Sequence, residues 1–203
     1  MILFQLAKGM LVSIEIFALT LLFSLPLGLV VAFGRMAKNV VLRSMTKAYI
    51  SIMRGTPLML QLLFKVKIGP GYRFVAVILA FSINYAAYFA EIYRSGIESM
   101  PVGQYEAAKV LGYNWGQTFF KIILPQVIKR ILPSVTNEII TLVKDTSLAF
   151  AIAQAEMFTI AKQIAAKETT IMPLMIAGVF YYIFNLIVAV VMEKIEKAFA
   201  YYK

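Results

Sequence analysis

The sequence predicts an all-α membrane protein built from about five transmembrane helices. Apolar residues make up 61% of its 203 positions and charged residues only 15%, whereas soluble domains contain about 45–50% apolar residues. The mean hydropathy is +0.81. The apolar residues gather in five stretches, and a membrane-spanning helix needs ~17–25 such residues. Because these stretches leave little room for a soluble domain, we expect residues 1–203 to form a single transmembrane domain.

The five expected spans differ in quality. They are residues 10–33, 48–64, 74–93, 131–153 and 171–192. The first has Glu15 as its only charge, and the last has no charge. The second is short and is interrupted by Gly55-Thr56-Pro57 directly after Arg54. The fourth is weakened by three charged residues, Glu138, Lys144 and Asp145.

The lysines and arginines indicate how the chain is oriented. There are 20 of them, against 10 acidic residues. With the N-terminus outside, twelve of the 20 fall in cytoplasmic segments and six in external ones. Since basic residues concentrate on the cytoplasmic side, we expect an N-out, C-in orientation. The net charge of +10 is then a topology signal rather than a nucleic-acid footprint. We expect no cleaved signal peptide, because the first apolar run is too long and four basic residues follow it.

The composition also excludes several kinds of chemistry. The chain has no histidine and no cysteine. A Ser-His-Asp triad, a thiolate nucleophile, a disulfide and a cysteine or histidine metal site are therefore excluded. An intramembrane hydrolase would need a nucleophile and a base, and no such pair is evident. An enzyme is accordingly the least favoured class.

Residues 94–130 form the longest hydrophilic segment, and they face the cytoplasm in this orientation. The stretch 104–112, QYEAAKVLG, predicts a short helix that ends at Gly112. Three small or apolar residues are expected on one face of it, namely Ala107, Ala108 and Leu111. From the pattern alone, two interpretations stay open: the helix lies in a groove of another protein, or it rests on the lipid headgroups.

One spacing in this segment is more specific than helical periodicity. Glu106-Ala107-Ala108 is followed after three residues by Gly112, and after nine more by Ile122-Ile123-Leu124-Pro125. This pattern resembles the signature loop of bacterial ABC importer permeases, in particular the polar amino acid branch of the histidine, glutamine and arginine permease type. Other stretches that fit this branch are Arg54-Gly55-Thr56-Pro57, Ala87-Tyr88 with Glu91 and Arg94, Gly103-Gln104-Tyr105-Glu106, Asn137-Glu138, and Lys144-Asp145-Thr146-Ser147-Leu148. The resemblance covers nearly the whole chain, and the basic segment 64–73 departs from it.

The resemblance implies a division of labour among several chains of the bacterial inner membrane. Such permeases pair, as homodimers or heterodimers, around a central path with alternating access. Two cytoplasmic ABC ATPase subunits bind ATP and Mg, and an external solute-binding protein delivers the substrate. This chain lacks a Gly-x-x-x-x-Gly-Lys-Ser/Thr motif, so we expect no cofactor in it. The implied ATPase-coupling residues are Glu106, Ala107, Ala108, Gly112, Leu124 and Pro125.

Polar groups within the spans are the candidates for the substrate path, because they are costly in lipid and usually functional. A broken helix exposes backbone groups that membranes tolerate only beside protein or a water-lined cavity, which favours the break at 55–57. Together with the resemblance, this predicts a path for a basic or polar amino acid. Its expected residues are Glu15, Arg54, Thr56, Leu58, Asn84, Tyr88, Glu91 and Glu156. For Glu15, Arg54 and Glu91, a structural role as a capping or ion-pair group is the alternative.

Two other classes of function remain as alternatives. A subunit of a secondary transporter would also use intramembrane acids, but it has no need for the cytoplasmic loop described above. A structural subunit of another membrane complex would not need Glu15 and Arg54 in the bilayer. Copurification with an ATPase separates the first alternative from an ABC permease, and a transport assay separates the second.

Overall fold

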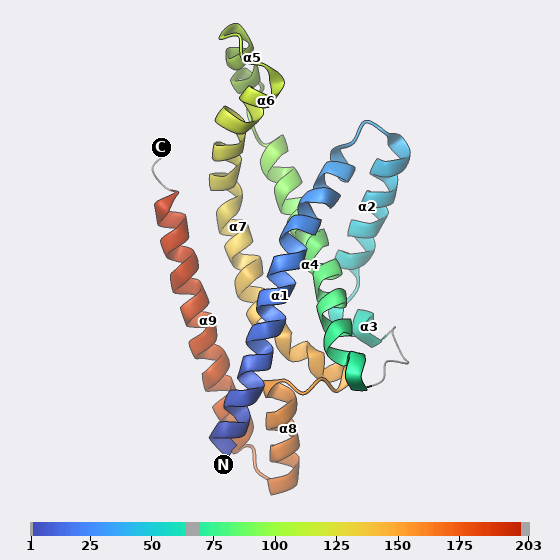
Figure 1. Cartoon of the computed structure of the whole chain (residues 1–203), viewed down its shortest axis with the longest axis vertical. Coiled ribbons are helices and arrows are strands. Elements are labelled where there is room, and N and C mark those ends of the chain that lie inside the picture. The colour runs from blue at the N-terminus through green and yellow to red at the C-terminus, as the bar shows by residue number, and fades with distance from the viewer. Residues whose placement is uncertain (1, 64–69, 200–203) are drawn as a thin grey trace.

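The computed structural model describes residues 2–63 and 70–199, and it is helical throughout with no strand among those residues. Figure 1 shows the long helices running side by side, with the shorter ones gathered at the two ends. The helices are α1 (Ile2–Met36), α2 (Val40–Gly55), α3 (Leu58–Leu63), α4 (Arg73–Glu98), α5 (Val102–Val110), α6 (Trp115–Gln117), α7 (Leu124–Asp145), α8 (Met157–Glu168) and α9 (Met172–Ala198). Shorter turns are the 3-10 turns Pro70–Tyr72 and Thr146–Ile152 and the π-helical turn Thr118–Ile123.

Three of the described helices are long and apolar enough to cross a membrane, namely α1, α4 and α9. The other two expected spans are not single helices of this kind. The span expected at 48–64 is divided between α2 and α3, and its last residue lies outside the described residues. The span expected at 131–153 is divided between α7 and the 3-10 turn Thr146–Ile152. Its charged residues lower its hydropathy, as the sequence indicated.

The interruption expected at Gly55-Thr56-Pro57 is confirmed, since α2 ends at Gly55 and α3 begins at Leu58. Thr56 is extended, with φ −122° and ψ 142°. The cause is local: Pro57 has no N–H to donate, and a proline disfavours the helical conformation at the residue before it. The break therefore follows from the sequence rather than from packing.

Helix α1 packs along α4 and α8 through a row of small residues spaced about four apart. Its buried positions include Thr20, Ser24, Gly28 and Ala32. Gly9 and Ser13, nearer its start, face α8 instead. A Cβ at Gly28 would lie 2.8 Å from the Cβ of Phe89 on α4, so no larger residue fits there without a shift. Small residues at such positions let membrane helices approach closely. This contact makes α1 and α4 the central pair of the bundle.

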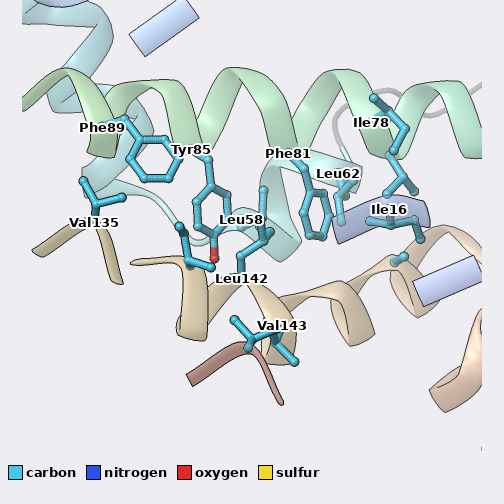
Figure 2. Packing of buried hydrophobic residues seen from close by; sticks show 14 of the residues in the cluster. Ile16, Leu58, Leu62, Ile78, Phe81, Tyr85, Phe89, Val135, Leu142 and Val143 are labelled. Carbon is cyan, nitrogen blue, oxygen red and sulfur yellow. The ribbon is translucent and has the colours of Figure 1, made fainter. Parts of the chain in front are cut away.

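The main core lies between α4, α3 and α7. Figure 2 shows Phe81, Tyr85 and Phe89 projecting from α4 toward Val135, Leu142 and Val143, with Leu58 and Leu62 of α3 beside them. A second, smaller core joins the start of α1 to α8 and α9 through Leu6, Met10, Met157, Ala161 and Ala177. The second core holds α8 at the end of the bundle where the chain begins (Figure 1).

The opposite end of the bundle carries α5 and α6 (Figure 1). Helix α6 begins with a capping box, in which the side chains of Asn114 and Gln117 each accept a hydrogen bond from the other residue's backbone N–H. The π-helical turn then leads into α7, where Pro125 lies in the first turn. The N–H of Leu124 still donates back to the carbonyl of Phe119 in that turn, whereas Pro125 has no N–H to donate.

Candidate functional site

A cavity of about 490 Å³ opens at the break between α2 and α3. Three parts of the fold form its walls: the end of α2 with the start of α3, one face of α4, and one face of α7 with the following turn. Its lining residues are Arg54, Gly55, Thr56, Pro57, Leu58, Asn84, Tyr85, Tyr88, Glu138, Thr141, Asp145 and Leu148. The cavity therefore combines a cation, two carboxylates, an amide and hydroxyl groups in a predominantly apolar chain.

The charged groups lie on opposite walls. Arg54 comes from the last turn of α2, and its guanidinium lies over the ring of Tyr88, 5.2 Å from the ring centre. Glu138 and Asp145 come from α7, seven residues apart, so helical periodicity puts them on one face two turns apart. The hydroxyl of Tyr85 donates a 2.8 Å hydrogen bond to Asp145 Oδ2. Groups of both signs thus border one polar space.

Five of the residues expected in the substrate path line this cavity, namely Arg54, Thr56, Leu58, Asn84 and Tyr88. Asn84 is 3% exposed, and its amide donates to the carbonyl of Met53 at 3.0 Å. The amide is therefore already engaged with the broken helix. Leu58 is buried and Thr56 is exposed, so the polar group at the break faces outward while the apolar one packs inward.

Glu91 lies on α4 outside the cavity lining. It forms an ion pair with Arg94, which also pairs with Glu98. The sequence suggested that Asn84, Tyr88 and Glu91 share a face, and the first two line the cavity while Glu91 does not. The ion-pair alternative considered for Glu91 matches this geometry.

Glu15 is exposed on α1 and is not among the cavity-lining residues. Its neighbours on the chain include Leu11 and Ile14, which are also exposed. A carboxylate on an otherwise apolar helix face is costly in lipid unless water or another protein covers it. Glu15 therefore lies at a surface that either water or another protein covers.

Glu156 is fully buried, but its role in the fold is clear. As the N-cap of α8 it accepts hydrogen bonds from the backbone N–H of Phe158 and of Thr159, each at 2.7 Å. The hydroxyls of Thr159, Tyr181 and Ser13 also donate to it, at 2.8, 3.0 and 3.3 Å. Burial raises the pKa of Glu156, and these hydrogen bonds oppose the rise. The expected role in the substrate path has no support from this position, which is that of a capping hub.

The hydrophilic segment 94–130 contains a helix, α5, which begins at Val102, two residues before the start expected from the sequence. It ends with Gly112 in the left-handed region at φ +77°, where the N–H of Gly112 donates to the carbonyl of Lys109 at 3.0 Å. Glu106 and Ala107 are exposed while Ala108 is buried. Of the three residues expected on one face, Ala107 and Leu111 are exposed and Ala108 is covered by the rest of the chain.

The end of the bundle around α5 exposes several large apolar side chains. The exposed fraction is 88% for Val110, 72% for Leu111 and 75% for Trp115. Leu124 and Pro125, also expected to act in coupling, are half-buried at the start of α7. Exposed apolar side chains of this kind mark a contact with another protein or with the membrane.

Sequence reasoning did not assign Tyr85, Thr141, Glu138, Asp145 or Leu148 to the cavity. The signal was present in part: Glu138 and Asp145 stood out as charges that weakened the expected fourth span, and their spacing of seven predicts one helical face. Within residues 2–63 and 70–199, no cluster of three His, Cys, Asp or Glu side chains could hold a metal ion.

Comparison with known proteins decides the family. Residues 24–201 match the family described as "Binding-protein-dependent transport system inner membrane component". The chain belongs to this family. Its members are inner-membrane transport permeases, so this chain is a permease subunit rather than an enzyme, and a separate ATPase hydrolyses ATP.

Curated relatives of this family match over nearly the full chain. An L-cystine transport system permease protein of Bacillus subtilis is 36% identical, with 95% of this chain and 85% of the relative covered. A probable amino-acid ABC transporter permease protein of Bacillus subtilis is 41% identical over 87% of this chain and 80% of its own. An arginine transport system permease protein of Corynebacterium glutamicum is 34% identical over 96% and 68%.

Two solved structures share the fold of this chain. The crystal structure of an amino acid ABC transporter with histidines aligns with a TM-score of 0.86 at 29% identity, covering 96% of this chain and 94% of the other. An inward-facing methionine ABC transporter aligns with a TM-score of 0.78 at 19% identity over 97% of each chain. The second likeness shows the fold alone.

Proposed function

We propose that this chain is the membrane subunit of an ATP-driven importer for a basic or polar amino acid, and that the substrate passes through the cavity between α2, α3, α4 and α7. The observation that carries the proposal is that Arg54, Glu138 and Asp145 line the same cavity. Every α-amino acid has a carboxylate for a guanidinium and an ammonium for a carboxylate. The second acid suits a further cationic group on the side chain.

The relatives support the same class of substrate. Permeases named for cystine and for arginine match this chain at 36% and 34% identity. Cystine is polar and arginine is basic, which fits a cavity with more carboxylates than cations. We assign Arg54, Thr56, Leu58, Asn84 and Tyr88 to the path, and we add Tyr85, Thr141, Glu138 and Asp145 to them.

Glu15, Glu91 and Glu156 take different places in this proposal. A hydrocarbon core about 30 Å thick takes up ~20 helical residues, so α1 with Arg35 at the inner boundary has Glu15 near the outer one. Glu15 then belongs to the outer mouth, where a second subunit or water covers it. Glu91 stabilises the inner end of α4 through Arg94. Glu156 acts on the path only indirectly, through its hold on α8.

We propose five spans with an N-out, C-in orientation, the two broken segments serving as spans two and four. Twelve of the 20 lysines and arginines are then cytoplasmic and six external, as the positive-inside rule favours. The two ends of the described chain lie toward opposite ends of the bundle (Figure 1), which is consistent with an odd number of spans. Lys65, Lys67 and Lys203 belong to this count but lie outside the described residues.

We further propose that residues 1–203 form a single transmembrane domain. Within it, residues 94–130 form the loop that contacts the ATPases and transmits their movement. Glu106 and Ala107 on α5 are exposed for this contact, and the apolar side chains of Val110, Leu111 and Trp115 extend it. Two ATPase subunits would meet two permease subunits, which form a homodimer or a heterodimer. A polar cavity open toward the bilayer needs a second subunit to cover it, and an external binding protein supplies the substrate.

Reconstitution of the chain with its ATPases and binding protein in proteoliposomes tests the proposal. We expect uptake of arginine, histidine or glutamine. This uptake should require ATP on the side of the membrane where the ATPases lie. Uptake driven by an ion gradient without ATP would instead support a secondary transporter. A complex that assembles but moves none of the common amino acids with ATP would contradict the assigned substrate class.

A further inference from the structure

The broken end of α2 leaves backbone carbonyls that a regular helix would have satisfied. The last four carbonyl groups of any helix lack a partner within it. In a membrane each unpaired group costs several kcal/mol, since lipid offers no hydrogen bonds. The carbonyls at this break therefore need donors from elsewhere in the chain, and the identity of those donors decides what holds the break in shape.

Gln61 supplies two N–H donors at this break. The two hydrogens of its side-chain Nε2 are shared among three acceptors, which are the carbonyls of Met53 and Thr56, each at 3.1 Å, and the hydroxyl of Thr56 at 2.7 Å. The Thr56 hydroxyl in turn donates to the carbonyl of Ile52 at 2.8 Å. The side-chain amide of Gln61 on α3 thus satisfies backbone carbonyls at the end of α2, on the other side of the break.

Asn84 of α4 completes the arrangement. Its Nδ2 donates to the same Met53 carbonyl at 3.0 Å and to Gln61 Oε1 at 2.9 Å. The two amides therefore bind each other and share one backbone oxygen. Asn84 is buried and Gln61 is half-buried, so this pair ties α2, α3 and α4 together beside the cavity.

The position of the shared oxygen matters for the charge in the cavity. Met53 immediately precedes Arg54, and Thr56 follows it by two residues. The amides thus fix the backbone on both sides of Arg54, whose guanidinium lies against Tyr88 in the cavity. Gln61 itself does not line the cavity. Its effect on a ligand there would act through the backbone that carries Arg54.

We infer that Gln61 is a positioning residue for substrate capture, which with Asn84 holds the α2–α3 break so that Arg54 faces the substrate carboxylate. The inference rests on the proposed function of the cavity. Loss of the Gln61 donors should leave the ATPase cycle running but should loosen the group that retains the substrate. Transport per ATP hydrolysed should therefore fall, while hydrolysis itself continues.

The Gln61→Glu substitution tests this, because it keeps the shape and replaces the donor Nε2 by an oxygen facing three acceptors. Gln163→Glu on the exposed side of α8 makes the same chemical change away from the break. In proteoliposomes of the full transporter, we expect Gln61→Glu to lower the amino acid molecules moved per ATP by at least tenfold, with hydrolysis within about twofold of wild type. Gln163→Glu should leave both unchanged.

A double-variant cycle shows whether Gln61 acts through Arg54, since residues that work as a unit give non-additive effects. In an Arg54→Gln background, Gln61→Glu should cause little further loss. Additive losses, an unchanged transport ratio, or parallel losses of transport and hydrolysis would overturn the inference. Gln61→Met, which adds no charge, replaces Gln61→Glu if the latter fails to assemble, and failure of both would make Gln61 a folding residue and also overturn it. Absence of ATP-driven uptake by the wild type would overturn the proposed function instead, and this inference with it.

Discussion

The hydroxyl of Tyr85 on α4 donates a hydrogen bond to the carboxylate of Asp145 at the end of α7, with 2.8 Å between the two oxygens. This bond joins two helices at the wall of the cavity and holds one of its two carboxylates in place. Tyr85 is 2% exposed, and its partner Asp145 is half-buried at the cavity. The position of a charged group in the cavity therefore depends on a side chain that is packed in the core.

Tyr85→Phe should destabilise the protein by about 1.5–3 kcal/mol, the usual worth of a hydrogen bond to a charged group. We also expect transport to fall several-fold, because Asp145 loses its fixed position. Thermal unfolding of the purified permease and uptake in proteoliposomes measure the two effects. The matched control is Tyr88→Phe, which keeps the ring under Arg54 and removes only a hydroxyl. Equal effects of the two substitutions would argue against a special role for the Tyr85–Asp145 bond.

Glu138→Gln should weaken capture of a basic amino acid more than that of a neutral one. A hydrogen bond to a charged group is worth ~1.5–3 kcal/mol, and about 1.4 kcal/mol corresponds to a factor of ten. We therefore expect uptake of arginine at low concentration to fall about 10–100-fold, and that of glutamine much less. Glu15→Gln removes the same charge from a residue outside the cavity lining and serves as the comparison.

A larger loss for Glu15→Gln than for Glu138→Gln would move the binding site from the cavity to the outer mouth of α1. Equal loss for arginine and glutamine with Glu138→Gln would mean that this carboxylate binds the α-ammonium group shared by all amino acids. Either result would be visible in the same uptake measurements at matched protein levels.

Glu156→Ala should make the protein unfold more easily, because it leaves five donors, three of them in buried hydrogen bonds, without their acceptor. At ~1–3 kcal/mol for an unsatisfied buried group and ~2–4 °C per kcal/mol for a chain of this size, Tm should fall by several degrees. Glu156→Gln keeps one acceptor and should lose less. The measurement is thermal unfolding in detergent.

The same carboxyl predicts a pH dependence. Burial raises the pKa of Glu156 in the folded state, so the folded protein holds this proton more tightly than the unfolded chain does. Its contribution to stability is fully present below the unfolded pKa and is lost as the pH rises through the folded pKa. Tm should therefore fall more steeply with rising pH in the wild type than in Glu156→Gln. Parallel curves for the two proteins would refute this.

Gly112→Leu should uncouple ATP hydrolysis from transport while leaving the chain inserted. The left-handed conformation of Gly112 costs an L-residue roughly 1–2 kcal/mol, although a Cβ there would meet no atom within 4 Å. The strain thus comes from the backbone and not from a clash. Gly112→Asn is the matched control, since asparagine tolerates this conformation. ATPase copurification and uptake should both drop for leucine and should largely persist for asparagine.

The orientation can be tested with single cysteines, because the natural chain has none. Lys8→Cys should react with an impermeant reagent added outside intact cells, and Lys197→Cys should react only after the membrane is opened. Both lysines are exposed in the structure. Labelling of position 197 but not of position 8 in intact cells would reverse the proposed topology.

The sequence was sufficient to predict where the chain breaks but not what the break faces. Pro57 and the glycine before it act locally, so the interruption of the second span could be predicted from neighbouring residues alone. The same holds for the end of α5, where only the glycine at 112 suits a positive φ. Arg54 and Thr56 were accordingly expected in the cavity that they line.

The partners of these residues depend on which helix faces meet, and helical periodicity does not specify that. Glu138 and Asp145 could be placed on one face of α7, but only the packing of α7 against α4 brings that face to the break. Glu156 illustrates the limit most clearly: its partner Ser13 lies 143 residues away in the sequence. An acid near a span end was expected in the path. It caps α8 through the local N–H groups of Phe158 and Thr159, and contacts with Ser13 and Tyr181 from distant helices complete its set of donors.

The exposure of Arg54 and Thr56 at the open side of the break has a consequence for biosynthesis. A subunit inserted without its partner would turn this polar side toward lipid, and an arginine at mid-bilayer costs about 2.5–3.5 kcal/mol on insertion scales. Assembly removes that cost, so unassembled copies are less stable than assembled ones. Membrane quality-control proteases would then clear the surplus, and the cellular amount of this permease would be set by the supply of its partner chains rather than by its own rate of synthesis.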